Sequence, residues 1–167
     1  MYVPFESLPP TARLWIYQSA RKFTDADKDI ISSTLSTFIE RWSTHGSAMK
    51  ASFDIRYDHF VIFAADEEHL SASGCSIDDS VRTFKSLDQQ LNAGFFDRER
   101  IAFRHADQSI GVIRMSDLKS EYLAGHWNDE TQTFNNLITE KAALDQWVLP
   151  AGNTWLKRYI LRQTQAS

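Results

Sequence analysis

The chain has 167 residues, enough for one domain that buries a hydrophobic core without disulfides or metal ions. Hydrophobic residues make up 43% and aromatic residues 13%, which is typical of a globular protein and excludes a disordered one. The 18 basic residues against 22 acidic ones give a net charge of −4, and such a surface repels phosphate backbones. We therefore expect no nucleic-acid partner.

Cysteine usage and the N-terminal stretch indicate the compartment. The single cysteine, Cys75, cannot form an internal disulfide, which favours a reducing environment. The first ten residues lack the basic and apolar regions of a signal peptide, and no apolar run approaches the length that crosses a bilayer. We expect a cytoplasmic protein without membrane insertion.

The first half of the chain predicts a strand, a helix and a further strand. Residues 14–17 are a short apolar run and predict the first strand. Thr24 and Asp27 have the spacing of a capping box, and the helical apolar pattern that follows predicts a helix closed by Gly46. Residues 49–57 alternate between apolar and polar side chains, as in a strand with one buried face.

The next elements repeat this order. Residues 60–65 are continuously apolar and predict a third strand. Residues 100–104 and 110–113 predict a fourth and a fifth strand. Between the third and fourth strands a second helix is predicted, with Gly94 beyond its end; its apolar face consists of Ile77, Val81, Phe84, Leu87 and Leu91.

The order of these elements predicts an α+β fold. Through residue 105 it reads β-α-β-β-α-β, the ferredoxin-like arrangement of an antiparallel sheet with both helices on one face. We expect a single domain of residues 1–167, in which residues 1–105 form this core and residues 106–167 form a C-terminal β/α extension. Within the extension, residues 133–138 are predicted to be a strand and residues 155–161 a helix that begins at Asn153 or Thr154.

The predicted sheet needs cover on both faces. Strands one and three are central in a ferredoxin-like sheet, and here both are apolar on their two faces. The face away from the helices would otherwise expose a large apolar surface. We expect residues 106–167 to pack on it or on a partner, and the chain to be a homo-oligomer or to bind a protein partner.

The stretch Ser-Gly-Cys-Ser-Ile-Asp, residues 73–78, is the main candidate site. A cysteine at a helix start is favoured as a thiolate, which would suit a nucleophile or a redox thiol. The alternative is structural: Ser76 caps the helix, two acids complement its dipole, and the cysteine packs as a small apolar residue. The candidate ligand- or partner-binding residues are Ser73, Gly74, Cys75, Ser76 and Asp78, with Cys75 the candidate catalytic residue.

Two short stretches of the sequence are similar to motifs of nucleotide hydrolases. Residues 61–67 are an apolar strand that ends in Asp-Glu, and residues 70–74 are similar to the signature loop of ABC ATPases. The G-x-x-x-x-G-K-[ST] phosphate loop is absent, and the two fragments occur in the reverse of the order found in ABC ATPases. The interpretation we favour is a central strand that ends in solvated acids, with no ATPase activity and no cofactor.

Metal binding has one candidate cluster at the end of the third strand, where Asp66, Glu67 and His69 follow one another closely. A catalytic zinc site uses three converging ligands, commonly at a spacing such as H-E-x-x-H. That spacing does not occur here, so no metal site is predicted.

Several stretches resemble a family of small uncharacterised bacterial proteins whose members often carry the label "ABC transporter ATPase". They are residues 1–18, 73–78, 134–137 and 155–158. The resemblance covers nearly the whole chain and implies a family, but because no activity is established for its members it assigns no catalytic residues to this chain. Because the phosphate loop is missing, we interpret the label as a misassignment.

Two functional hypotheses result. The first is a non-catalytic, self-associating binding module that uses the loop at residues 73–76 and the aromatic, basic C-terminus as its surfaces. The second is a small cysteine-dependent enzyme or redox protein that uses Cys75.

Overall fold

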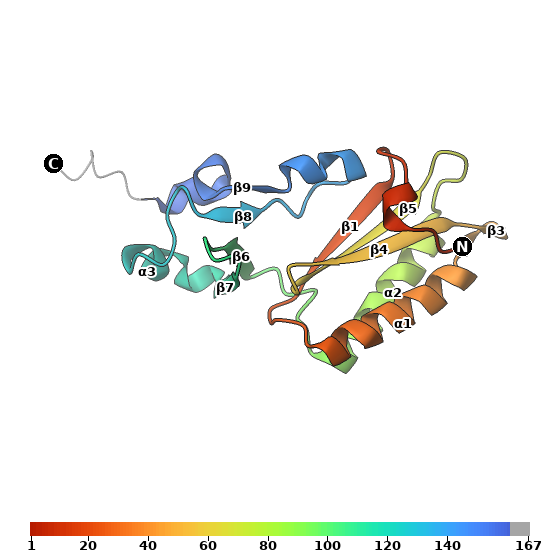
Figure 1. Cartoon of the computed structure of the whole chain (residues 1–167), viewed down its shortest axis with the longest axis horizontal. Helices are drawn as coiled ribbons and strands as arrows, with labels where there is room; N and C mark the ends of the chain where they lie inside the picture. Colours follow the sequence, from red (N-terminus) through yellow and green to blue (C-terminus); the bar gives the residue numbers. More distant parts are fainter. Residues whose placement is uncertain (161–167) are drawn as a thin grey trace. The chain divides into compact units, whose positions relative to one another are not determined.

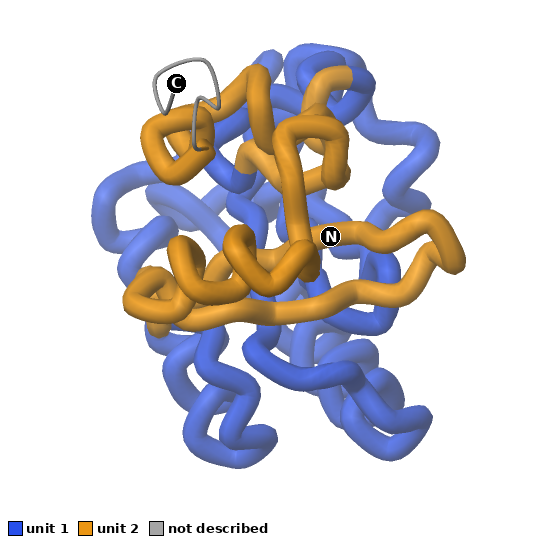
Figure 2. Tube along the Cα trace, turned by 90° about the vertical axis from the view of Figure 1, so that its left-hand side faces the viewer, with its two compact units in different colours: residues 1–96, 136–145 blue, residues 97–135, 146–167 orange. Residues whose placement is uncertain are grey.

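The computed structural model describes residues 1–160, and its mixture of helices with antiparallel sheets confirms the predicted α+β class. The chain forms two compact units. The first consists of Met1–Phe96 with Asn136–Asp145, and the second of Asp97–Asn135 with the residues from Gln146 on (Figure 2). Within residues 1–160 no helix combines the length and the apolar character that a bilayer span requires.

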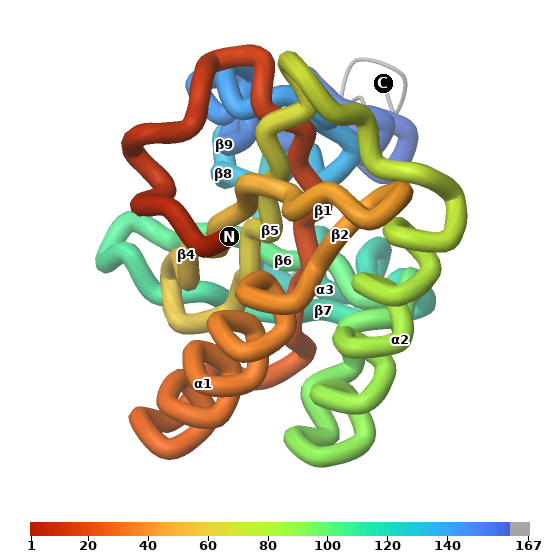
Figure 3. The backbone as a smooth tube through the Cα atoms, turned by 90° about the vertical axis from the view of Figure 1, so that its right-hand side faces the viewer, coloured from red at the N-terminus to blue at the C-terminus, as the bar shows by residue number. Residues whose placement is uncertain are grey.

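The first unit is built on a three-stranded antiparallel sheet in the order β1-β5-β4. The strands are β1 (Arg13–Gln18), β4 (Lys50–Arg56) and β5 (Phe60–Asp66). Helices α1 (Asp25–Arg41) and α2 (Gly74–Leu91) lie side by side on one face of this sheet (Figures 1 and 3). This order is that of the first three strands of a ferredoxin-like sheet.

The predicted fourth strand of that sheet lies elsewhere, which corrects the expected ferredoxin-like core of residues 1–105. Strand β6 (Arg100–Arg104) belongs to the second unit, in an antiparallel sheet with the order β7-β6-β8-β9. The other strands are β7 (Ile110–Arg114), β8 (Gln132–Phe134) and β9 (Val148–Pro150). The physical reason is burial, because Phe103 of β6 is fully buried in a core with Leu118 and Trp127.

The outer edge of β1 pairs instead with a segment from late in the chain. The N–H of Leu14 donates to the carbonyl of Thr139 (2.9 Å), and the N–H of Lys141 donates to the carbonyl of Ala12 (2.9 Å). The bridge between Arg13 and Glu140 is antiparallel. The sequence predicted a full fourth strand beside β1. Residues 139–141 take that place instead, over a short stretch at the start of β1.

Strand β5 is central and apolar on both faces, as predicted for the third strand. Val61, Phe63 and Ala65 pack in the core formed with the helices. Phe60, Ile62 and Ala64 point to the opposite face and are also fully buried. Part of that face is covered within the first unit by η1 (Phe5–Ser7), since the guanidinium carbon of Arg56 lies 5.7 Å from the centre of the Phe5 ring.

A short hairpin follows α1, formed by β2 (Ser43–Thr44) and β3 (Ser47–Ala48). Its two turn residues, His45 and Gly46, have φ of 49° and 80°, as a two-residue hairpin turn requires. Gly46 therefore turns the hairpin, whereas the sequence pattern predicted that it closes the helix. Helix α1 ends at Arg41.

Up to residue 160, the second unit contains one short α-helix and several 3-10 turns. The ring of Phe103 stacks on Trp127 with their centres 5.2 Å apart. The predicted strand 133–138 is shorter than expected because β8 ends at Phe134. The predicted helix 155–161 is a 3-10 turn whose Thr154 hydroxyl accepts from the N–H of Leu156, and residue 161 lies outside the described residues. The remaining elements of the second unit are η2 (Met115–Asp117), α3 (Leu118–Leu123), η4 (Ala151–Asn153) and η5 (Trp155–Tyr159), while η3 (Lys141–Gln146) lies mostly in the first unit.

Candidate functional site

The predicted site residues 73–78 form the start of α2. The helix begins at Gly74, and the Ser73 hydroxyl accepts a hydrogen bond from the N–H of Ser76 (3.1 Å). Ser73 is therefore the N-cap, and the prediction that Ser76 caps this helix is wrong. The Ser76 hydroxyl is buried and donates to the carbonyl of Ser43 (2.9 Å), so it anchors the helix to the hairpin.

The two acids of this stretch lie beyond the first turn of α2, so they do not complement the dipole there as predicted. Asp79 lies between two arginines, with its carboxylate 3.4 Å from Arg41 and 3.6 Å from Arg82. Asp78 is exposed to solvent. Asp79 therefore links the two helices at the surface, while Asp78 remains available to a partner.

Cys75 is exposed in the first turn of α2 rather than packed as a small apolar residue. Within residues 1–160 no side chain hydrogen-bonds to its sulfur. A cysteine nucleophile is activated by a helix start, as here, and further by a neighbouring base or cation, while a redox pair needs a second thiol. Among the five predicted binding residues, Gly74, Cys75 and Asp78 are exposed, whereas the two serines hold the helix in place.

The candidate metal ligands at the end of β5 and just after it hold a loop in place through hydrogen bonds to its backbone. The Asp66 carboxylate accepts from the N–H of Glu68 (3.0 Å). The Glu67 carboxylate accepts from the N–H of Ala72 (2.6 Å), and His69 is exposed. In the described part of the chain no group of three or more His, Cys, Asp or Glu side chains could hold a metal ion.

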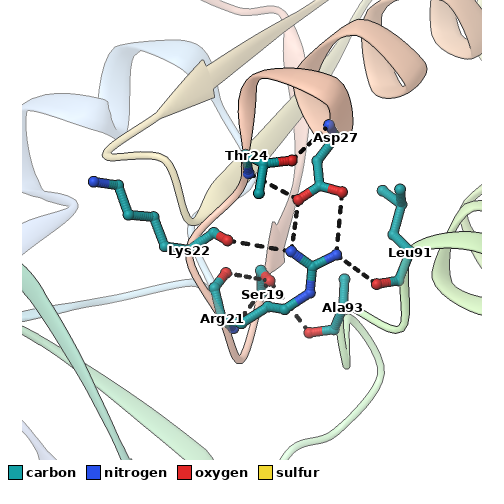
Figure 4. A network of polar contacts seen from close by, with 7 residues as sticks. All are labelled: Ser19, Arg21, Lys22, Thr24, Asp27, Leu91 and Ala93. Carbon is teal, nitrogen blue, oxygen red and sulfur yellow. Dashed lines mark hydrogen bonds and ion pairs between the residues drawn. The ribbon is translucent and has the colours of Figure 1, made fainter.

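A polar network that the sequence did not reveal joins the two helices (Figure 4). Arg21 binds the Asp27 carboxylate through two nitrogens, at 2.6 Å and 3.2 Å. One of these nitrogens also donates to the carbonyl of Leu91 (2.6 Å), the last residue of α2. Arg21 therefore ties the start of α1 to the end of α2.

The same carboxylate completes the capping box, which was predicted from the sequence and is confirmed. Asp27 accepts from the N–H of Thr24 (2.8 Å), and the Thr24 hydroxyl accepts from the N–H of Asp27 (3.1 Å). Hydrogen bonds from Arg21 and Thr24 hold the pKa of Asp27 well below its usual range. Because the carboxylate and the guanidinium are bound to each other, this network is structural rather than catalytic.

Ser19 and His59 extend the network into the sheet. The fully buried Ser19 hydroxyl donates to the carbonyl of Arg21 (2.7 Å), and the Ser19 N–H donates to the carbonyl of His59 (2.6 Å). His59 is buried in the turn between β4 and β5, and burial lowers its pKa. Its Nδ1 lies 3.0 Å from the Tyr57 carbonyl oxygen, a contact that fits a structural residue in the turn.

The outer edge of β4 is open at Phe53 and Ile55, beyond the point where the N-terminal segment pairs with it. The N–H of Ala51 donates to the carbonyl of Met1, and its carbonyl accepts from the N–H of Val3, both at 3.1 Å. Since edge groups alternate along an antiparallel strand, Phe53 and Ile55 also point their N–H and carbonyl groups outward. No hydrogen bond to these outward groups comes from residues 1–160.

Comparison with known proteins adds no assignment. Neither a scan against protein-family models, nor a search of curated proteins, nor a search of solved structures found a match for this chain. The geometry of the described residues is therefore the basis for the function that follows.

Proposed function

We propose that this chain is a non-catalytic binding module that acts through protein–protein contact and associates with copies of itself in a reducing compartment such as the cytoplasm. The observation that carries the proposal is the open outer edge of β4 at Phe53 and Ile55. An unpaired strand edge is a template for another strand, and main-chain hydrogen bonds supply the affinity.

The side chains along this edge support the same function. Phe53 and Ile55 are half-buried, and the ring of Tyr2 lies 6.0 Å from that of Phe53 while remaining 40% exposed. An incoming strand would therefore cover apolar surface as well as complete the hydrogen bonds. Aromatic and β-branched side chains that meet across paired strands stabilise the pairing.

Light scattering after size-exclusion chromatography, from micromolar to submillimolar concentrations, tests this function. We expect a mass of twice the 19.2 kDa of the chain at the upper concentrations. A monomer at every concentration contradicts self-association.

The competing candidate is a cysteine-dependent enzyme or redox protein, favoured by the exposure of Cys75 in the first turn of an α-helix. Alkylation by iodoacetamide across pH separates the two, because an activated thiol is ionised and reacts fast at or below neutral pH. The binding module predicts a rate at neutral pH no higher than that of glutathione. A rate at least tenfold higher would favour the enzyme.

The resemblance to proteins labelled as ABC transporter ATPases leads to a separate measurement. The absent phosphate loop removes the backbone amides and the lysine that bind ATP phosphates in such enzymes. Calorimetry with ATP and magnesium should show no binding to this chain. Clear magnesium-dependent affinity would overturn the interpretation of the label as a misassignment.

A further inference from the structure

The open edge of β4 is confined to a short stretch, which limits how a second strand can join it. The outward N–H and carbonyl of Ala51 are already bonded to the N-terminal segment, and β4 ends at Arg56 before the turn into β5. The outward groups available for pairing are those of Phe53 and Ile55, with Asp54 between them and Arg56 after them. In an antiparallel ladder, residues with outward groups must stand opposite each other.

We propose that two copies of the chain pair antiparallel along β4 about a twofold axis at Ile55, an inference that rests on the proposed self-association. Ile55 of each copy then donates its N–H to the carbonyl of Ile55 in the other copy. The two three-stranded sheets become one continuous sheet.

Charge selects this register among the alternatives. An axis at Asp54 would place two carboxylates opposite each other, which is destabilising. An axis at Phe53 would bring Ile55 against Ala51, whose groups are already bonded to the N-terminal segment. An axis at Ile55 places Asp54 opposite Arg56 of the second copy, and Arg56 opposite Asp54 of the second copy.

The order of these side chains points to a second copy as the partner. Asp54-Ile55-Arg56 is self-complementary, because the same three residues run in reverse on an antiparallel copy. Both charged side chains are about one-third exposed, at 36% for Asp54 and 35% for Arg56. Within one copy the Arg56 Nε donates to one Asp54 oxygen (2.9 Å), so the other carboxylate oxygen and the terminal guanidinium nitrogens can pair across the axis.

Two charge reversals in the full chain test this register. Asp54→Arg alone and Arg56→Asp alone each place like charges across the axis, and we expect at least tenfold weaker association for each. An equal mixture of the two variants restores opposite charges at both positions. Native mass spectrometry should therefore detect a heterodimer in the mixture at concentrations at which each variant alone is monomeric. Lys85→Glu, an exposed charge reversal on α2, is the matched control and should leave the dimer unchanged.

The outcomes separate the register from the function. A wild-type monomer overturns both. A wild-type dimer that persists in both charge variants overturns the register alone, and so does a mixture that stays monomeric. Hydrogen exchange on the wild-type dimer needs no substitution and covers the case of a variant that does not fold. We expect the Ile55 amide to gain at least tenfold protection on dimerisation, and an Ile55 amide that gains none overturns the proposal.

Discussion

Arg21 and Asp27 form a side-chain pair that several hydrogen bonds join to both helices of the first unit. Asp27→Asn keeps an oxygen that can accept from the N–H of Thr24 but removes the charge that binds Arg21. Because charge-assisted hydrogen bonds contribute more than neutral ones, we expect a loss of about 2 kcal/mol in the free energy of unfolding at pH 7. Urea denaturation measures it. Asp25→Asn is the control, since Asp25 is exposed in the same helical turn.

The pH dependence of this pair follows from the lowered pKa of Asp27. A carboxyl whose pKa is lower in the folded state than in the unfolded chain stabilises the fold above its unfolded value, about 3.9. That stabilisation is lost as the pH falls from about 4 toward the folded pKa. The difference between wild type and Asp27→Asn should therefore be constant near neutral pH and shrink below about pH 4. A difference that grows in acid would contradict this assignment.

Tyr17 gives the opposite prediction at alkaline pH. Its ring stacks on Phe84 with the centres 3.7 Å apart, and burial raises its pKa to about 12. The neutral phenol therefore stabilises the fold below about pH 10, and this contribution is lost as the pH rises toward the folded value. Tyr17→Phe keeps the stacking but cannot ionise.

Denaturant unfolding at several pH values tests the Tyr17 prediction. Relative to Tyr17→Phe, wild type should lose about 1.4 kcal/mol of stability per pH unit above about pH 10. Tyr2→Phe, which removes an exposed phenol, serves as the comparison. An unchanged difference between wild type and Tyr17→Phe from pH 10 to pH 12 would show that the buried phenol does not govern alkaline unfolding.

At the scale of elements, the start of α2 depends on Ser73. Its hydroxyl accepts from the N–H of Ser76, and loss of an N-cap hydroxyl typically costs about 1 kcal/mol. We expect Ser73→Ala to lower the thermal midpoint measured by circular dichroism, and Ser73→Asp to restore it because aspartate is an equally good cap. Cys75→Ser should have no effect, since Cys75 is exposed. An unchanged midpoint in Ser73→Ala would argue against this cap.

Helix caps show which local features could be predicted from the sequence. The Thr24–Asp27 capping box was predicted correctly because its bonds lie within one turn. At α2 the sequence offers two serines three residues apart, and burial of Ser76 against the carbonyl of Ser43 decides between them. Gly46 was misassigned because a positive φ suits both a helix end and a hairpin turn, and the sequence pattern fits either.

Long-range contacts account for what could not be predicted. The alternation of β6 identifies it as a strand but carries no information about which sheet it joins. That choice depends on Leu118 and Trp127, which bury Phe103 and come later in the chain. Arg21 was missed for the same reason, since its partner at Leu91 is 70 residues away. The sequence also could not predict that Cys75 is exposed, because a residue in the first turn of a helix can face either the core or the solvent.

At the scale of the whole molecule, the first unit needs residues from both ends of the sequence. Residues 139–142 bond to the start of β1 and to the residues just before it, and the Lys141 ammonium donates to the carbonyl of Leu8 (2.6 Å). A fragment of residues 1–105 would leave those groups of β1 unpaired, and an exposed strand edge promotes aggregation. We expect this fragment to aggregate or to unfold without a cooperative transition.

A second fragment supplies the missing segment. Residues 1–96 joined to residues 136–145 by a long Gly/Ser linker contain the whole first unit. A flexible linker lowers the stability of the fragment by little more than the entropy of closing the loop. This fragment should unfold cooperatively on heating and stay soluble, as measured by circular dichroism and light scattering. If the two fragments show the same solubility and the same cooperativity of unfolding, then the edge of β1 does not need to pair with residues 139–142. In that case the sheet, rather than the late segment, would determine the stability of the first unit.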